Sequence, residues 1–235
     1  KNTANDSNYS AIRVASPYST NFVVADDLAV IGNGGSTSAN SSAVNVSNLS
    51  TYDYIRIGDF VMLHEVVVPS GYYMASGNSV TSISTTMPSS GDYAYYYNGV
   101  LTLTDYTYTG SSVAIRTYAD TLISLTGGSE VNHIISHAGD LTLQGSGVLE
   151  INTNLSSAAA INSNGNVSIN NGRITINSQN DGIYCNDFSL KNGFVWLTAN
   201  YHGINFNSNF TIQSGAITIK STNTSNDTSN RAINS

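Results

Sequence analysis

The sequence has little cysteine and little charge, and each shortage excludes a class of protein. Cys185 is the one cysteine, so an internal disulfide and a cysteine-based metal site are excluded. We interpret Cys185 as a small buried apolar side chain. Charged residues make up 10% of the chain, and the net charge is −7. This acidic balance argues against nucleic acid as a partner, because nucleic-acid-binding surfaces are basic. It also argues against attraction to anionic lipid.

Long apolar runs are missing as well. No stretch approaches 18 apolar residues, so we expect no membrane-spanning helix and no membrane insertion. The chain opens on Lys1 without the regions of a signal peptide, which we expect to have been removed or to lie upstream. Disorder is not expected, because 40% of the residues are apolar. The 235 residues suffice for one large all-β domain or two small ones.

The second half of the chain repeats itself at a short period. Four copies of its longest stretch align on a glycine: "GVLEINT" (147–153), "GRITINS" (172–178), "GFVWLTA" (193–199) and "GAITIKS" (215–221). We expect these glycines to occupy a corner where the backbone conformation is costly for other residues. Each copy follows a shorter alternating stretch, such as "NVSINN" (166–171), and precedes a third one, such as "DGIYC" (181–185). Alternation of apolar and polar residues is typical of β-strands.

Three short strands per repeat of about 21 residues predict an all-β parallel β-helix, or β-solenoid. Stacked turns, called rungs, then share one continuous apolar core that no single rung could bury alone. The third stretch of each repeat supplies isoleucines that recur after 22 and 21 residues: Ile161, Ile183 and Ile204. We expect this column to point inward, and we predict regular rungs for 110–235.

The first half of the chain is less regular. We interpret 1–50 as the last rungs of a preceding solenoid module, because "DDLAVIGNG" (26–34) fits the rung pattern. Residues 51–109 break the period and carry many tyrosines, so we interpret them as a module start that caps an open strand edge. The stretch 2–12 aligns with 223–233, which predicts neighbouring modules of the same chain as partners.

The repeat decides which way the single tryptophan points. Trp196 occupies the slot of three residues that face outward in the alignment: Glu150, Thr175 and Thr218. Phe194 lies two residues earlier and faces outward as well. We therefore expect an exposed aromatic pair on one rung, with Val195 and Leu197 in the core.

The exposed pair defines a candidate binding site. Flat aromatic rings stack on the apolar face of a pyranose, while neighbouring polar groups bind its hydroxyls. The candidate carbohydrate-binding residues are Phe194, Trp196, Arg173, Glu150 and Lys220. The two cations among them favour an acidic sugar. The alternative is that the pair docks a loop, another domain or a partner chain.

Metal and catalytic chemistry have weaker signals. Asp181 and Asp187 border one turn and are candidates to share a Ca²⁺ with backbone carbonyls, although no cofactor is required. The histidines show no ligand spacing for zinc. Glycoside hydrolysis needs paired carboxylates, and a lyase needs clustered carboxylates with a cationic base. We expect neither arrangement, because Glu150 and Asp140 join no column of acids in the repeat. We therefore favour a non-catalytic domain and keep an enzyme as an alternative.

The order of four sequence blocks resembles a known family. The blocks are "IRIGDFVMLHEVVVPSGYYM" (55–74), "YYYNGVLTLTDYTYTGSSVAI" (95–115), "GDLTLQGSGVLEI" (139–151) and "NDGIYCNDFSLKNG" (180–193). They look like bacterial cell-surface β-helix modules described as carbohydrate-binding domains, which are pectate-lyase-like in fold. The resemblance covers roughly 54–235. It implies a right-handed parallel β-helix, an extracellular place at the bacterial surface, polysaccharide binding and sometimes calcium. Calcium-binding relatives place Asp in the "DGI" turn, where only Asp181 matches.

The combined expectation is a non-catalytic, extracellular polysaccharide-binding or adhesive module of a bacterial surface protein. Two alternatives remain open. One is a structural stalk or adhesin spacer. An exposed tryptophan has no function in a stalk unless this side chain binds the next module. The other is a polysaccharide lyase or hydrolase of the pectate-lyase-like class.

Overall fold

The computed structural model describes residues 30–33, 39–40, 54–57, 61–63, 66–68, 70–76, 79–89, 91–222 and 231–235. The chain divides into two compact units, Lys1–Asp59 and Phe60–Ser235. Within these described ranges no helix is long and apolar enough to cross a membrane.

The described part of the first unit is a small antiparallel sheet in the order β2-β1-β3. Its strands are β1 (Val30–Asn33), β2 (Ala39–Asn40) and β3 (Tyr54–Ile57). These pairings are antiparallel, unlike those between solenoid rungs. Most of 1–50, including the aligned stretch 2–12, lies outside the described residues, so the predicted domain division stays a prediction.

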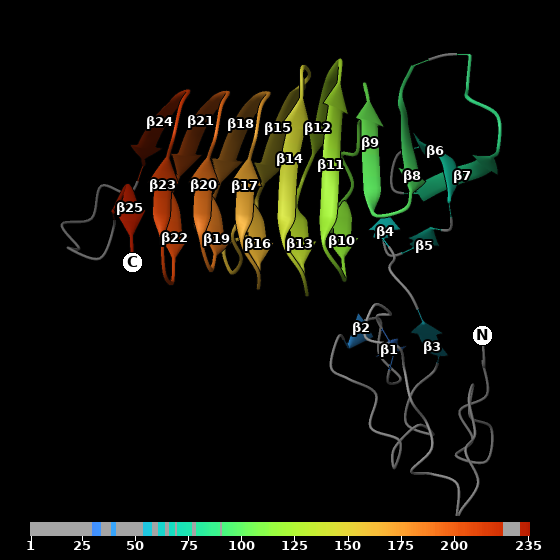
Figure 1. The fold of residues 1–235 in the computed structure, drawn as a ribbon, viewed down its shortest axis with the longest axis horizontal. Helices are drawn as coiled ribbons and strands as arrows, with labels where there is room; N and C mark the ends of the chain where they lie inside the picture. The colour runs from blue at the N-terminus through green and yellow to red at the C-terminus, as the bar shows by residue number, and fades with distance from the viewer. Residues whose placement is uncertain are drawn as a thin grey trace, which may run out of the picture. The chain divides into compact units, whose positions relative to one another are not determined.

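The second unit is a β-solenoid of about six turns with three strands per rung (Figure 1). Sheet I stacks β10 (Ile115–Thr117), β13 (Ile134–Ser136), β16 (Ile161–Ser163), β19 (Ile183–Cys185), β22 (Ile204–Phe206) and β25 (Ile233–Asn234). Sheet II stacks β9 (Val100–Thr104), β11 (Thr121–Thr126), β14 (Leu141–Gly145), β17 (Val167–Ile169), β20 (Phe188–Leu190) and β23 (Phe210–Ile212). Sheet III stacks β12 (Gly128–Val131), β15 (Val148–Thr153), β18 (Arg173–Ser178), β21 (Phe194–Ala199) and β24 (Ala216–Ser221). The predicted all-β solenoid is confirmed.

The core follows the inward columns of the repeat. Ile161 pairs with Ile183, and Ile183 pairs with Ile204, in parallel register. All three are fully buried, as is Cys185. The inner rungs bury alternate side chains against the rungs above and below, whereas the last rung, β23 to β25, has only partly covered or exposed side chains. The predicted column of isoleucines is confirmed.

The glycine corner has two physical causes. Gly172, Gly193 and Gly215 adopt positive φ angles of 106°, 103° and 92°, which other residues rarely tolerate. Gly147 lacks such an angle, so the expectation of a special backbone conformation is wrong for this residue. There a Cβ would lie only 2.7 Å from the carbonyl oxygen of Gly127, so the close approach of two rungs excludes a side chain.

Antiparallel strands cover the first edges of sheets I and II (Figure 1). These strands are β4 (Val61–Leu63), β5 (Val66–Val68), β6 (Gly71–Ser76), β7 (Ser79–Ser84) and β8 (Tyr93–Tyr97). Strand β4 pairs with β10, and β8 pairs with β9. Tyr73 and Tyr96 are buried here, so part of the tyrosine-rich segment is packing material. The first rungs therefore present no bare strand edge in these two sheets.

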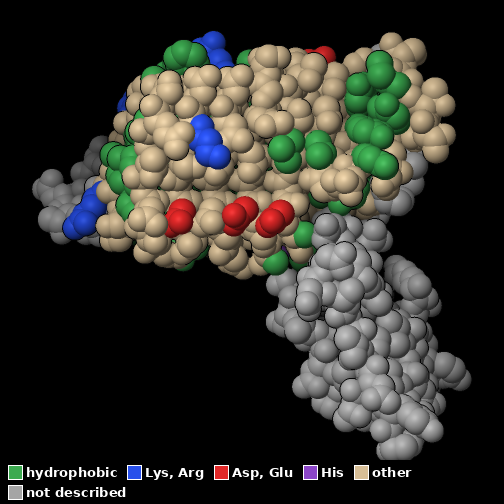
Figure 2. Space-filling model, in the orientation of Figure 1, with side chains coloured by type: hydrophobic (Ala, Val, Ile, Leu, Met, Phe, Trp, Pro, Cys, Tyr) green, Lys and Arg blue, Asp and Glu red, His purple; other side chains and the backbone are tan. Residues whose placement is uncertain are grey.

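Acidic and amide side chains form a ladder at the corner between sheets I and II. Asp120 Oδ1 accepts the backbone N–H of Asp140 (2.8 Å), and Asp140 Oδ1 accepts that of Asn166 (2.9 Å). Asn166 Oδ1 accepts the N–H of Asp187 (3.1 Å), and Asp187 Oδ1 accepts that of Asn209 (2.9 Å). Acidic side chains in a row are visible along the solenoid in Figure 2. The ladder satisfies backbone donors at the bend between the two sheets. The expectation that Glu150 and Asp140 join no column of acids is therefore wrong, because Asp140 stacks on Asp120 and Glu150 pairs with Glu130 on the next strand.

Candidate functional site

Strand β21 carries the two exposed aromatic residues on one face of sheet III. The side chains alternate along the strand: Val195 and Leu197 are 1% and 2% exposed, whereas Phe194 and Trp196 are 53% and 38% exposed. The expected outward position of Trp196 is confirmed. We call Phe194 and Trp196 the aromatic platform.

The two rings of the aromatic platform are nearly parallel. Their centroids lie 5.9 Å apart, and the ring planes are inclined by 20°. Because both residues belong to a strand that is paired on each side, the backbone holds their spacing. The rings are therefore stacked against each other, and their exposed parts offer rigid aromatic surface of the kind that contacts sugar rings.

Arg173 lies directly against the aromatic platform. Arg173 belongs to the neighbouring strand β18 and pairs there with Phe194 of β21. Its guanidinium carbon lies 4.4 Å from the centroid of the Trp196 ring. A cation at this distance is attracted by the π face of the indole. The contact covers part of one ring face and fixes a planar hydrogen-bond donor beside the exposed aromatic surface.

The other two predicted binding residues lie at different distances from the platform. Lys220 is exposed on β24 and pairs with Thr198, two residues along β21 from Trp196. Glu150 is in the same outward column as Trp196 but two strands away, with Thr175 between them. The structure therefore groups Phe194, Trp196 and Arg173 tightly, with Lys220 beside them and Glu150 farther along the sheet. Their role in sugar binding stays a prediction.

The two candidate calcium ligands have separate partners in the next rung. Asp181 Oδ1 accepts hydrogen bonds from the N–H of His202 (3.0 Å), and Asp181 Oδ2 accepts one from the Asn205 amide (3.1 Å). Asp187 belongs to the corner ladder, on the other side of β19. Within the described ranges no group of three or more His, Cys, Asp or Glu is suited to hold a metal. The shared Ca²⁺ site stays a prediction.

Sequence reasoning missed the pairing of Asp181 with His202. His202 Nδ1 lies 3.0 Å from Asp181 Oδ1, and each side chain is 14% exposed. The signal was present, because the two residues occupy the same turn in consecutive rungs, 21 positions apart. In a solenoid such an offset places two side chains in contact.

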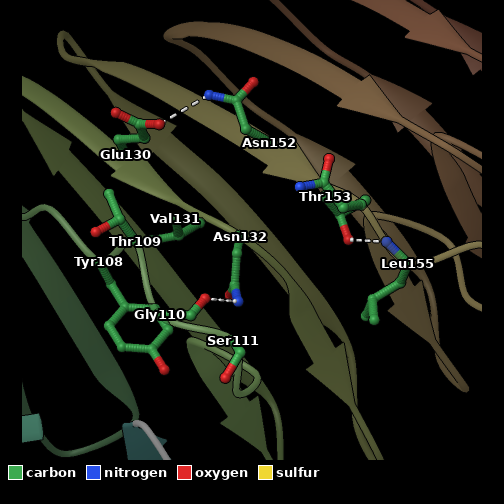
Figure 3. Close-up of a pocket in the computed structure, with 11 residues that line it drawn as sticks. Tyr108, Thr109, Gly110, Ser111, Glu130, Val131, Asn132, Asn152, Thr153 and Leu155 are labelled. Atoms are coloured by element: carbon green, nitrogen blue, oxygen red, sulfur yellow. Dashed lines mark hydrogen bonds between the residues drawn. The ribbon is translucent and has the colours of Figure 1, made fainter. Parts of the chain in front are cut away.

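A cleft of about 410 Å³ lies at the β12 and β15 end of sheet III (Figure 3), and we call it the polar cleft because most of its lining residues are polar. Its walls are the segment 108–111, the ends of β12 and β15, and residues 154–155. The Asn152 amide donates to Glu130 Oε1 (2.9 Å) across its rim. The sequence did not predict this cleft, because the segment 108–111 lies outside the repeat.

A second aromatic surface covers strands β6 and β8. The Tyr72 ring lies 4.4 Å from that of Tyr95 and 5.3 Å from that of Tyr93, measured between centroids. Tyr97 on the same strand is 59% exposed. Figure 2 shows a hydrophobic patch over this end of the molecule.

Comparison with known proteins places the chain in a family. No curated protein and no solved structure matches it. A family model described as "carbohydrate-binding domain-containing protein" matches residues 67–235, which is more than half of the chain and includes sheets I to III. The chain therefore belongs to the family of carbohydrate-binding domain-containing proteins.

Proposed function

We propose that the solenoid is a non-catalytic polysaccharide-binding module that contacts its ligand through the aromatic platform. The observation that carries this proposal is the pair of exposed, nearly parallel rings with a guanidinium beside them. The apolar face of a pyranose would stack on the exposed ring surface. The family match to carbohydrate-binding domains supports the ligand class.

The charges around the platform favour an acidic polysaccharide. Arg173 presents a planar donor that suits a carboxylate, and Lys220 adds a second positive charge on the neighbouring strand. A guanidinium that contacts the indole through its face can still donate its in-plane N–H groups to a sugar carboxylate, so binding would require no movement of the backbone. The rigid sheet limits the ordering cost of binding.

We also propose that the module acts outside the cell, at a bacterial surface. The sequence resemblance to surface β-helix modules supports this location. Single sites of this kind bind weakly, and neighbouring modules of one chain would raise the avidity for a long polysaccharide.

The test is calorimetry and pull-down on pectin, xylan, cellulose and mucin glycans. Wild-type protein should bind at least one of them, and Trp196→Ala should lose most of that affinity while its thermal melt stays the same. Tyr97→Ala is the matched control, because it removes an exposed aromatic side chain from a different sheet. If Tyr97→Ala loses binding and Trp196→Ala does not, the tyrosine surface replaces the platform as the site.

Two further outcomes would move the protein to another class. New reducing ends or unsaturated products would make it a hydrolase or a lyase. Absence of binding to any glycan would favour a structural stalk. A loss of binding in Arg173→Gln for acidic glycans only would support the proposed role of the guanidinium.

A further inference from the structure

We propose that the polar cleft is a second sugar subsite, and that one glycan chain reaches from the aromatic platform to the cleft across the strands of sheet III. This inference rests on the proposed function and deepens it. It names residues outside the platform and a chemical pattern that the ligand must have.

The platform and the cleft lie on the same outward face. Trp196 pairs with Thr175, Thr175 with Glu150, and Glu150 with Glu130 at the rim of the cleft. These four residues form one column across the consecutive strands β21, β18, β15 and β12. With about 4.8 Å between neighbouring strands, the column spans about 14 Å, a length that several linked pyranose rings cover.

A hydrogen-bonded relay runs in the next column from β18, beside the platform strand, to the rim of the cleft. The Asn177 amide donates to Asn152 Oδ1 (2.8 Å), and the Asn152 amide donates to Glu130 Oε1 (2.9 Å). These bonds fix the orientation of both amides. Each NH₂ group has a second N–H, and each carbonyl oxygen has a second lone pair, for sugar hydroxyls. The relay thus supplies oriented polar groups along the path from the platform to the cleft.

The cleft wall is built by the fold. The Asn132 amide donates to the carbonyl oxygens of Gly110 and Ser112, and its Oδ1 accepts the N–H of Ala114 (3.0 Å). One side chain therefore holds the segment that forms the outer wall of the cleft (Figure 3). Leu155, which is 38% exposed, supplies an apolar patch on the opposite side. Polar groups beside a small apolar surface are typical of sugar subsites.

Charge along sheet III selects the ligand. Glu130 and Glu150 lie toward the cleft, whereas Arg173 and Lys220 lie toward the platform. A sugar carboxylate in the cleft would meet a like charge, which is unfavourable. The cleft is therefore suited to an uncharged sugar unit and the platform to an acidic one. The ligand class is an acidic polysaccharide with interspersed neutral units, such as a partly methyl-esterified one.

The experiment is calorimetry of the whole chain with partly methyl-esterified oligogalacturonides, from disaccharide to hexasaccharide. Wild-type affinity should rise at least tenfold with length. Asn152→Ala should lower hexasaccharide affinity about fivefold, the size of one or two lost hydrogen bonds, and leave disaccharide affinity unchanged. The matched control is Asn162→Ala, an outward position on β16 in sheet I. Thermal melts check that both variants fold.

A charge variant tests the cleft independently. Glu130→Gln keeps an oxygen for the Asn152 amide but removes the negative charge, so it should raise the affinity for fully de-esterified hexasaccharides. Affinity that is independent of length, or equal effects of Asn152→Ala and Asn162→Ala, would overturn the cleft subsite and leave the platform. Absence of binding to any of these sugars and to the polysaccharide panel would overturn both proposals.

Discussion

The guanidinium carbon of Arg173 lies 4.4 Å from the centroid of the Trp196 ring, across two neighbouring rungs of the solenoid. Neither side chain contributes to the core, because both occupy outward positions of their strands. The contact therefore shapes the surface of sheet III, and its loss should alter ligand binding more than folding.

The alternation along β21 predicts unequal losses of stability for two adjacent substitutions. Leu197→Ala should lower the free energy of unfolding by about 2–5 kcal/mol, since it leaves a cavity in the core. Trp196→Ala should cost less than about 1 kcal/mol, as is usual for a surface position. Urea unfolding followed by circular dichroism measures both. Equal losses in the two variants would show that the assigned register of β21 is incorrect.

His133 should make the protein sensitive to acid. Burial, together with the positive charge of Arg116, lowers the pKa of His133 from 6.5 to about 4. As the pH falls from 6.5 toward 4, His133 is protonated in the unfolded state but stays neutral in the folded state. The contribution of neutral His133 to the free energy of unfolding is fully present above pH 6.5. It decreases across this window, by roughly 3 kcal/mol for such a shift.

Urea unfolding at pH 7 and pH 4.5 tests this prediction. The difference between the two pH values should be smaller in His133→Leu than in wild-type protein. Part of the difference should remain, because burial and Arg116 also lower the pKa of His137. An identical difference in both proteins would show that His133 does not control the acid sensitivity.

Calcium removal should have little effect on stability. The described carboxylates of Asp181 and Asp187 already accept hydrogen bonds from the next rung, so they do not need a metal to bridge the rungs. EDTA should shift the melting temperature by only a few degrees. A fall of more than about 10 °C would indicate several structural Ca²⁺ sites, since a site saturated a hundredfold contributes about 2.7 kcal/mol.

Cys185 should be inert in the folded protein. Burial and the neighbouring Asp187 carboxylate raise the pKa of its thiol to about 12, which leaves almost no thiolate at pH 8. A disulfide reagent that releases a coloured thiol should give no signal with native protein at pH 8 and one equivalent after denaturation. Rapid reaction of the native protein would mean that the sheet I column opens readily.

The repeat made the solenoid and the direction of Trp196 predictable. Strand alternation and a fixed period together assign each side chain to the core or the surface, as Val195 and Trp196 illustrate. The period also fixes which residues stack, so the corner ladder from Asp140 through Asn166 to Asp187 was implicit in the sequence. Residue type alone does not distinguish an acceptor of backbone hydrogen bonds from a calcium ligand, so the sequence did not reveal the place of Asp187 in this ladder.

The cleft could not be predicted in the same way. Its wall depends on Asn132, whose partners Gly110 and Ser112 lie about a rung earlier in a segment without strand alternation. The path of such a segment is set by tertiary contacts, and the sequence gives no period from which to place it. The cap strands β4 to β8 are a similar case, since their antiparallel pairing follows from turns that the repeat does not contain.

The stacking of rungs also determines how the molecule should respond to force. The hydrogen bonds between rungs in sheets I to III run along the solenoid axis, and each rung contacts only its neighbours. Tension along this axis would therefore detach one rung at a time, beginning at an end, while the remaining core stays packed. The rungs from Ile161 to Ile183 and from Ile183 to Ile204 have 22 and 21 residues, and each stores about 70 Å of extended chain. The solenoid would thus lengthen stepwise under load and dissipate mechanical work as an extensible tether.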